Sequence, residues 1–117
     1  VIVDSARIAQ AIRHLIMNAV SYSTPGTAID IELSADDRDV TMTVRDHGIG
    51  IPLDQQKKVF TLFFKVHAGG VHDRGGLGVG LYLAREIVRR HGGEMWFESE
   101  EGKGSSFHMR LPLARTT

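Results

Sequence analysis

The sequence predicts a two-layer α+β sandwich, in which three helices cover one face of a mixed, largely antiparallel sheet of about five strands. Three observations support this fold class. Segments with helical spacing of apolar residues alternate with segments in which every second residue is apolar. Their order is helix, two strands, short helix, loop, helix, two strands. The length of 117 residues is enough for one domain with a core and too short for two, so residues 1–117 are expected to form a single domain.

The first half of the chain predicts a helix followed by a hairpin. A helix is expected between Asp4 or Ser5, as the N-cap, and the turn at residues 24–26. Residues 27–35 alternate and predict a strand, with Ile29, Ile31 and Leu33 on one face. A turn at residues 36–38 leads to a second strand, in which Asp46 continues the phase of the apolar residues Val40, Met42 and Val44.

The second half predicts two further helices and two strands. A short polar helix is expected around residues 53–58, and a longer amphipathic helix from about residue 79 to residue 91, where Gly92-Gly93 ends it. Alternating residues predict strands at 95–99 and 105–111. The segment between the helices, residues 65–76, is polar and glycine-rich and is expected to be a loop.

Composition excludes several classes of function. The formal net charge is zero, so the basic surface typical of a nucleic-acid or anionic-membrane binder is not expected. The chain has no cysteine, which excludes disulfides and thiolate metal sites. No apolar stretch has the ~20 residues of a membrane-spanning helix. The first residue is valine, which suggests a piece of a longer protein.

Asp46 is the most informative side chain. The alternation of its strand places it on the face that the helices cover, where an unpaired carboxylate would cost several kcal/mol. Gly48 and Gly50 are expected to leave open space beside it, in which a flat ligand such as adenine could offer an amine to the carboxylate. The alternative is that Asp46 caps the following turn, which is common for Asp before Gly.

A polar stripe borders the apolar face of the first helix. His14, Asn18 and Tyr22 are four residues apart, so they share one side of the helix. An amide oxygen such as that of Asn18 is a suitable ligand for Mg²⁺ that bridges phosphates. Equally, Asn18 could be an ordinary surface residue and Tyr22 a residue at the boundary of the core.

Residues 75–80 read Gly-Gly-Leu-Gly-Val-Gly and lead directly into the longer amphipathic helix. Glycines and unpaired amides at a helix N-terminus together favour an anion, above all a nucleotide phosphate. The run lacks the Gly-Lys-Ser/Thr ending of a P-loop, and no strand precedes it as in a Rossmann motif. A flexible hinge is the alternative. Lys65, Arg74 and Lys103 are candidates for contacts with phosphate charge.

These segments together resemble the catalytic and ATP-binding domain of sensor histidine kinases, which has the Bergerat fold of the wider gyrase, heat-shock chaperone and histidine kinase ATPase superfamily. Residues 7–10 and 14–23 resemble the N box, residues 44–52 the G1 box, residues 60–65 the F box and residues 75–81 the G2 box. Ser99 and residues 102–107 resemble the closing glycine motif. The resemblance extends from Arg7 to Pro112.

The resemblance implies ATP and Mg²⁺ as ligands. Asp46 would accept the adenine amine with support from Ser105, while Asn18 would hold Mg²⁺. Tyr22 and Lys65 would contact phosphate oxygens, with Asn18 and Lys65 as the catalytic pair, and residues 65–74 would form a mobile ATP lid. The further nucleotide-binding residues implied are Gly48, Gly50, Ile51, Phe60, Gly76, Leu77, Gly78, Val79, Gly80 and Leu81.

Two positions depart from the pattern of this family. His14 stands where these kinases usually have Asn and where the true ATPases of the superfamily have a Glu general base, so weak intrinsic ATP hydrolysis is expected. Ser21 replaces a lysine that is common in the family, which predicts modest nucleotide affinity.

The resemblance therefore implies a histidine kinase domain that transfers the γ-phosphoryl group of ATP to a histidine of a separate dimerisation domain. The other partner is a response regulator, and no contact with nucleic acid or membrane is expected. The isolated domain is expected to be monomeric and cytoplasmic; whether the parent is anchored in the inner membrane is open. A degenerate binding module without kinase activity, an anti-sigma serine kinase and a clamp ATPase are the alternatives.

Overall fold

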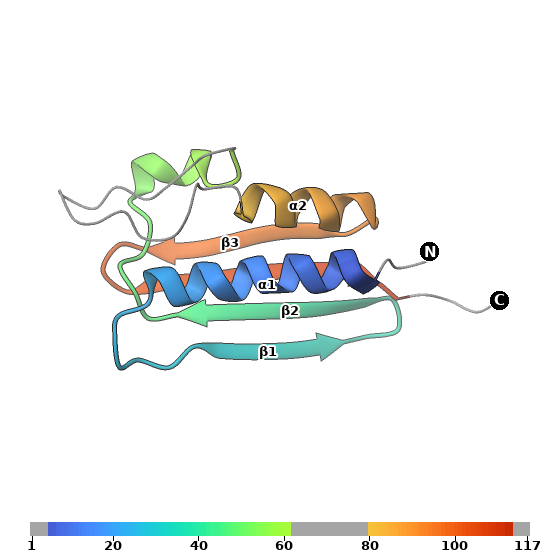
Figure 1. Ribbon diagram of the computed structural model, residues 1–117, viewed down its shortest axis with the longest axis horizontal. Coiled ribbons are helices and arrows are strands. Elements are labelled where there is room, and N and C mark those ends of the chain that lie inside the picture. The colour runs from blue at the N-terminus through green and yellow to red at the C-terminus, as the bar shows by residue number, and fades with distance from the viewer. Residues whose placement is uncertain (1–4, 62–79, 114–117) are drawn as a thin grey trace.

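The computed structural model describes residues 5–61 and 80–113. Two helices lie side by side on one face of a four-stranded antiparallel sheet (Figure 1). The helices are α1, Ser5–Tyr22, and α2, Gly80–Arg90. The strands are β1, Asp30–Ala35; β2, Asp39–Asp46; β3, Glu94–Glu100; and β4, Gly104–Pro112. A 3₁₀ helix, η1, spans Leu53–Lys58 after β2.

The sheet has the strand order β1-β2-β4-β3, so the central pair joins the two halves of the chain. β1 pairs with β2 and β3 with β4 as hairpins, whereas β2 and β4 pair across a long separation in sequence. The register places Asp46, the last residue of β2, opposite Ser105 of β4. The end of β2 is therefore held by a strand from the other half of the molecule.

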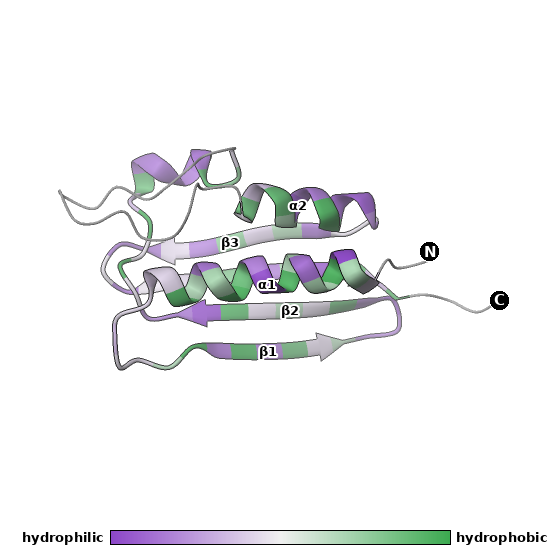
Figure 2. Cartoon of the chain, in the orientation of Figure 1, coloured by the Kyte–Doolittle hydropathy of each residue, from purple (hydrophilic) through white to green (hydrophobic). Residues whose placement is uncertain are grey.

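The core lies between the helices and the sheet. Leu15 of α1 and Val88 of α2 are almost fully buried, as is Val44 of β2. Figure 2 shows hydrophobic and hydrophilic residues alternating along both helices, which is the pattern of helices with one buried side. The core holds Ala11, Leu15, Ala19, Met42, Val44, Ile51, Val59, Ala84, Ile87, Val88, Met95, Phe107, Met109 and Leu111.

The two-layer architecture confirms the predicted fold class, with two corrections: the sheet of the described residues has four strands rather than about five, and all of its pairings are antiparallel rather than mixed. The predicted short helix at residues 53–58 is present, as a 3₁₀ helix. The turn after β1 forms as predicted, because the Asp36 carboxylate accepts bonds from the backbone N–H groups of Arg38 and Asp39 at 2.8 Å each. The first strand begins at Asp30, three residues later than the alternation of residues 27–35 predicts.

The edge strand β1 is the least covered part of the sheet. Ile31 and Leu33 pair with Val44 and Met42 of β2 and so share the helix-side face, yet they are 50% and 70% exposed. α1 packs against α2 and β2, so the helices do not cover β1. Within the described ranges, no helix is long and apolar enough to cross a membrane.

Candidate nucleotide-binding site

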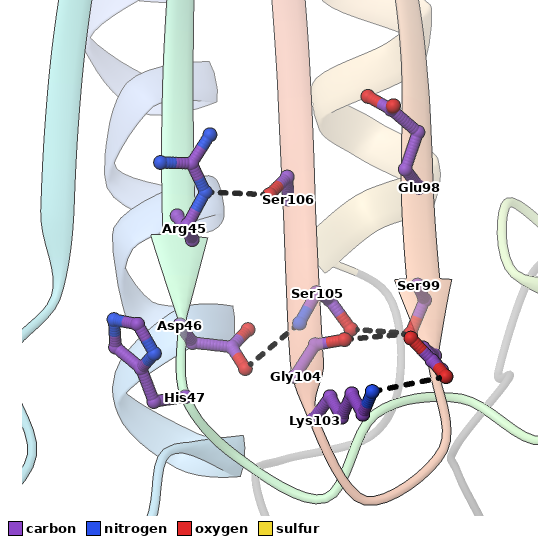
Figure 3. A pocket seen from close by; sticks show the side chains of 10 residues that line it. Arg45, Asp46, His47, Glu98, Ser99, Lys103, Gly104, Ser105 and Ser106 are labelled. Atoms are coloured by element: carbon purple, nitrogen blue, oxygen red, sulfur yellow. Dashed lines mark hydrogen bonds and ion pairs between the residues drawn. The ribbon is translucent and has the colours of Figure 1, made fainter.

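The carboxylate of Asp46 lies at the centre of the candidate site and is only 3% exposed. Its Oδ1 atom accepts hydrogen bonds from the backbone N–H of Gly48, at 3.0 Å, and of Ser105, at 3.3 Å. Figure 3 shows the carboxylate directed from the end of β2 toward Ser105 on β4. The bond to Gly48 is the turn-capping contact that the sequence offered as the alternative role of Asp46.

The second carboxylate oxygen distinguishes Asp46 from a purely structural capping residue. Within residues 5–61 and 80–113, no donor contacts Oδ2. A carboxylate can accept several hydrogen bonds, and two amides on one oxygen fix its orientation without using the other. Asp46 therefore closes the turn with Oδ1, while Oδ2 has no partner among the described residues.

Burial raises the pKa of Asp46 above its ordinary value, and the hydrogen bonds from Gly48 and Ser105 partly oppose this shift. The cause is the removal of the carboxylate from water, which disfavours its charged form. A ligand that donates a hydrogen bond to the carboxylate would favour the charged form again.

Gly48 and Gly50 do not open space for a ligand, which corrects the expectation from the sequence. An ideal Cβ on Gly48 would lie 1.7 Å from the backbone oxygen of Tyr22. On Gly50, whose φ is +70°, it would lie 2.1 Å from the backbone oxygen of Glu100. Both glycines are required because another segment of backbone already occupies the place of a side chain. They position the loop after Asp46 against α1 and against the turn after β3.

Two side chains hold the backbone of Ile51, which lies in the loop after Asp46. Its backbone N–H donates to Ser99 Oγ at 2.8 Å, and its carbonyl accepts from Gln56 Nε2 at 3.0 Å. Gln56 also donates to the carbonyl of Ser99 at 3.2 Å. Sequence reasoning did not identify Gln56, and no local pattern marks it, since its partners come from β3 as well as from the preceding turn.

Ser105 contacts Asp46 through its backbone rather than its side chain. The Ser105 hydroxyl lies 2.8 Å from the Ser99 hydroxyl, within the same network that holds Ile51 (Figure 3). The expected support of Asp46 by Ser105 is thus provided by the amide of the residue.

The predicted polar stripe of α1 leads away from Asp46. Tyr22 is the last residue of α1, and its carbonyl accepts from the Ile49 N–H at 3.3 Å, which places it beside the loop after Asp46. Asn18 and His14 follow at intervals of four residues, a rise of about 6 Å each. The side chain of Asn18 is half-buried and makes no hydrogen bond among the described residues. Its amide is available to a ligand.

His14 lies where α1 meets the first residue of α2. An ideal Cβ on Gly80 would lie 3.3 Å from His14 Nδ1, so the ring packs against the start of α2. The other ring nitrogen, Nε2, is buried and has no hydrogen-bond partner. Burial and the neighbouring charge of Arg13 lower the pKa of His14, which favours the neutral form of the ring.

Two predicted nucleotide contacts take part in packing. Phe60 makes edge-to-face contacts with Phe97 and Phe107, at centroid distances of 5.7 and 6.3 Å, and Arg85 of α2 lies over its ring. Leu81 packs against the core from the first turn of α2. Phe60 therefore packs the segment after η1 against the sheet and against α2.

Several predicted residues lie outside the described ranges or have other partners. Lys103 pairs with Glu100 at 3.5 Å in the exposed hairpin between β3 and β4. The predicted loop from 65 to 76 is outside the described residues. Five predicted site residues also lie outside the described residues: Lys65, Gly76, Leu77, Gly78 and Val79.

A pocket at this end of the sheet is lined by Asp46 and Ser105 and also by residues on the opposite face of the sheet (Figure 3). Arg45 and Ser106 alternate with Asp46 and Ser105, so they face away from the helices, and Arg45 Nε donates to Ser106 Oγ at 3.0 Å. In the part of the chain that the structure describes, no cluster of three or more His, Cys, Asp or Glu residues could hold a metal. A metal in this site would rely on Asn18 and on the ligand itself.

Residues 3–115 match the family model of the histidine kinase-, DNA gyrase B- and HSP90-like ATPases. The chain belongs to this family. Among its curated relatives in this ATPase family, the sensor histidine kinase WalK of Bacillus subtilis (strain 168) is 37% identical over 112 residues, which are 94% of this chain and 18% of WalK. The adaptive-response sensory kinase SasA of Thermosynechococcus vestitus is 42% identical over 113 residues, 94% of this chain and 29% of SasA.

Solved structures of this ATPase family have the same fold. The mycobacterial sensor histidine kinase MprB superposes with a TM-score of 0.83 at 28% identity, over 96% of this chain and 76% of that one. Full-length ShkA in complex with AMPPNP superposes with a TM-score of 0.80 at 25% identity, over 97% of this chain and 23% of that one. The chain spans less than a third of the length of the curated relatives WalK and SasA.

Proposed function

We propose that residues 1–117 are the ATP-binding catalytic domain of a two-component sensor histidine kinase. The domain would position Mg-ATP so that a histidine nitrogen of a separate dimerisation domain attacks the γ-phosphorus. The bond from the γ-phosphorus to the bridging oxygen of the β-phosphate breaks, and ADP leaves. A response regulator would then receive the phosphoryl group. A cytoplasmic location is part of this proposal.

The observation that carries the proposal is the free oxygen of Asp46. Two backbone amides hold Oδ1, so Oδ2 is a fixed acceptor in a nearly buried position. An exocyclic amine of adenine is a suitable donor for it. Guanine has a carbonyl in place of this amine, which would meet the carboxylate with two acceptors facing each other.

The polar stripe of α1 fits the remainder of the nucleotide. Asn18 would hold Mg²⁺, which neutralises phosphate charge when it is bound. Tyr22 lies between Asp46 and Asn18 along this stripe, and Lys65 would contact the phosphates from the loop. Catalysis of this kind depends on positioning and charge neutralisation. These residues would act on the nucleotide, and the separate dimerisation domain would supply the attacking histidine. Since no Glu stands at position 14, intrinsic hydrolysis of ATP should be slow.

Calorimetry of the chain with Mg-ATP and Mg-GTP tests the nucleotide assignment. We expect binding of Mg-ATP and a loss of at least about a hundredfold for Mg-GTP, because a site that binds a donor discriminates strongly against its absence. Equal affinities for the two nucleotides would exclude Asp46 as the adenine acceptor.

A second experiment tests phosphoryl transfer. The full-length parent is incubated with γ-labelled ATP, and the phosphorylated residue is identified by its acid lability and by mass spectrometry. Phosphohistidine is expected in the parent. Phosphoserine on a partner would instead identify a serine kinase, and nucleotide binding without any phosphoprotein would identify a degenerate binding module.

A further inference from the structure

Ser99 interrupts the apolar pattern of β3. Met95 and Phe97 lie on the helix-side face of this strand, in the core or packed against it. Ser99 is the next residue on the same face, where the alternation would favour a third apolar side chain. A hydroxyl at this position therefore calls for polar partners.

The partners of the Ser99 hydroxyl come from two other segments. Its Oγ accepts from the backbone N–H of Ile51 at 2.8 Å and donates to the carbonyl of Gly104 at 3.2 Å. It also lies 2.8 Å from the hydroxyl of Ser105 (Figure 3). Ile51 belongs to the loop after β2, whereas Gly104 and Ser105 begin β4. One hydroxyl has one donor and two acceptor positions, so these three contacts use its full capacity.

The same two segments supply the amides that hold Oδ1 of Asp46. Gly48 donates from the loop, and Ser105 donates from the start of β4. The Ser105 amide is placed by the sheet, because Ser105 lies opposite Asp46 in the pairing of β2 with β4. The backbone of Gly104 also lies so close that an ideal Cβ would be 2.2 Å from the carbonyl oxygen of Asp46.

The Gly48 amide depends instead on how the loop is held. On the α1 side, the Ile49 N–H donates to the carbonyl of Tyr22 at 3.3 Å. On the β4 side, the hydroxyl of Ser99 accepts from Ile51. The loop is thus held from both sides, and Oδ1 can accept both amides only while the loop and β4 keep their spacing.

We propose that Ser99 is a positioning residue for base recognition, whose hydroxyl ties the loop after Asp46 to the start of β4 and so keeps both amides on Oδ1. This inference rests on the proposed function, because adenine is the donor that Oδ2 would meet. It goes further by naming a side chain that acts on recognition through Asp46.

Three variants test this role. Ser99→Ala removes the hydroxyl and Ser99→Thr keeps it. Ser106→Ala is the matched control, because the hydroxyl of Ser106 accepts one bond, from Arg45 at 3.0 Å, on the opposite face of the sheet. Calorimetry should show about a fivefold loss of adenosine affinity for Ser99→Ala, since one hydrogen bond contributes about 1 kcal/mol. Ser99→Thr and Ser106→Ala should bind adenosine as the unmodified chain does.

A measurement without ligand separates positioning from a loss of stability. The bonds from Gly48 and Ser105 lower the pKa of Asp46, as does the charge of His47, which is present in every variant. Loosening the loop in Ser99→Ala should therefore raise the pKa of Asp46 above that of the unmodified chain. ¹³C NMR titration of the Asp46 carboxyl in the folded chain measures this. Ser99→Cys, whose thiol forms weaker hydrogen bonds, should lie between Ser99→Ala and Ser99→Thr.

Each outcome decides one of the two proposals. An unchanged pKa of Asp46 in Ser99→Ala, an unchanged adenosine affinity, or equal losses in Ser99→Ala and Ser106→Ala would overturn the role of Ser99 and leave the proposed function standing. If Ser99→Ala does not fold, the comparison of Ser99→Cys with Ser99→Thr decides in the same way. Failure of the unmodified chain to bind adenosine would overturn both base recognition at Asp46 and the part of Ser99 in it.

Discussion

The two ends of the candidate site are built in opposite ways. At the Asp46 end, backbone from three segments fixes each polar group: Gly48 lies against the carbonyl of Tyr22, and Ser105 holds the carboxylate. At the His14 end, Asn18 makes no hydrogen bond among the described residues, and Nε2 of His14 is unpaired. If the proposed function holds, the protein completes the base-binding end by itself and depends on the ligand at the phosphate end. For a bound nucleotide, this difference predicts rigid recognition of the base and adaptable contacts with the phosphates.

The largest effect is expected from Asp46→Asn. The asparagine oxygen can still accept from Gly48 and Ser105, but its amino group would face the adenine amine, donor against donor. Adenosine affinity should fall by a factor approaching about 10⁴. Thermal unfolding should show no loss of stability, because the change removes a buried charge. Unchanged adenosine binding in calorimetry would show that the base-binding end is elsewhere.

Gly48→Ala should damage the same end through the backbone. The new Cβ would lie 1.7 Å from the carbonyl oxygen of Tyr22, so the loop must separate from α1. We expect a loss of about 3 kcal/mol in the free energy of unfolding, measured with urea. Gly26→Ala is the matched control: its φ is +86°, but no atom lies within 4 Å, so backbone strain alone should cost about 1 kcal/mol. Equal losses would contradict the close contact.

Asn18→Ala tests the phosphate end. If the amide holds Mg²⁺, the affinity for Mg-ATP should fall about tenfold, or about 1.4 kcal/mol, whereas metal-free ATP should bind nearly as before. Isothermal titration with and without Mg²⁺ measures both. A similar loss for the two forms of ATP would indicate that Asn18 contacts the nucleotide itself and not the metal.

The smallest effect concerns pH at the base-binding end. Burial raises the pKa of Asp46, and adenine binding requires the carboxylate. Adenosine affinity should therefore be complete above this pKa and decrease as pH falls through it, with a midpoint above the ordinary value of about 3.9. Over the same range, the stability of the unmodified chain should increase relative to Asp46→Asn, since the folded state takes up the proton first. A midpoint at or below the ordinary value would contradict the effect of burial.

The sequence predicts the layers of this fold well because apolar periodicity is a local signal. The helix at residues 5–22, the turn at Asp36 and the strands β2, β3 and β4 follow from spacing alone. The exposure of Ile31 and Leu33 could not be predicted, because the alternation of β1 does not reveal that α1 packs on β2 instead.

The surroundings of Asp46 were predictable from the sequence only in part. Asp46 could be placed on the covered face from the period of its strand. The reason for Gly48 could not, since it depends on the carbonyl of Tyr22, which tertiary packing brings to the loop. The same holds for Gln56, whose amide links Ile51 to Ser99 across two elements.

The contact between Asp46 and Ser105 has a consequence for biosynthesis. The two residues are 59 positions apart, and β2 finds its neighbour only when β4 arrives. A ribosome releases the N-terminal half first, so the carboxylate stays hydrated until β4 has emerged. Such distant pairing slows folding, because the entropy cost of closing a long loop precedes the favourable contacts between the strands. Truncation within β4 before Ser105 would thus leave a nascent chain whose helices can form but which lacks the amide that fixes the Asp46 carboxylate.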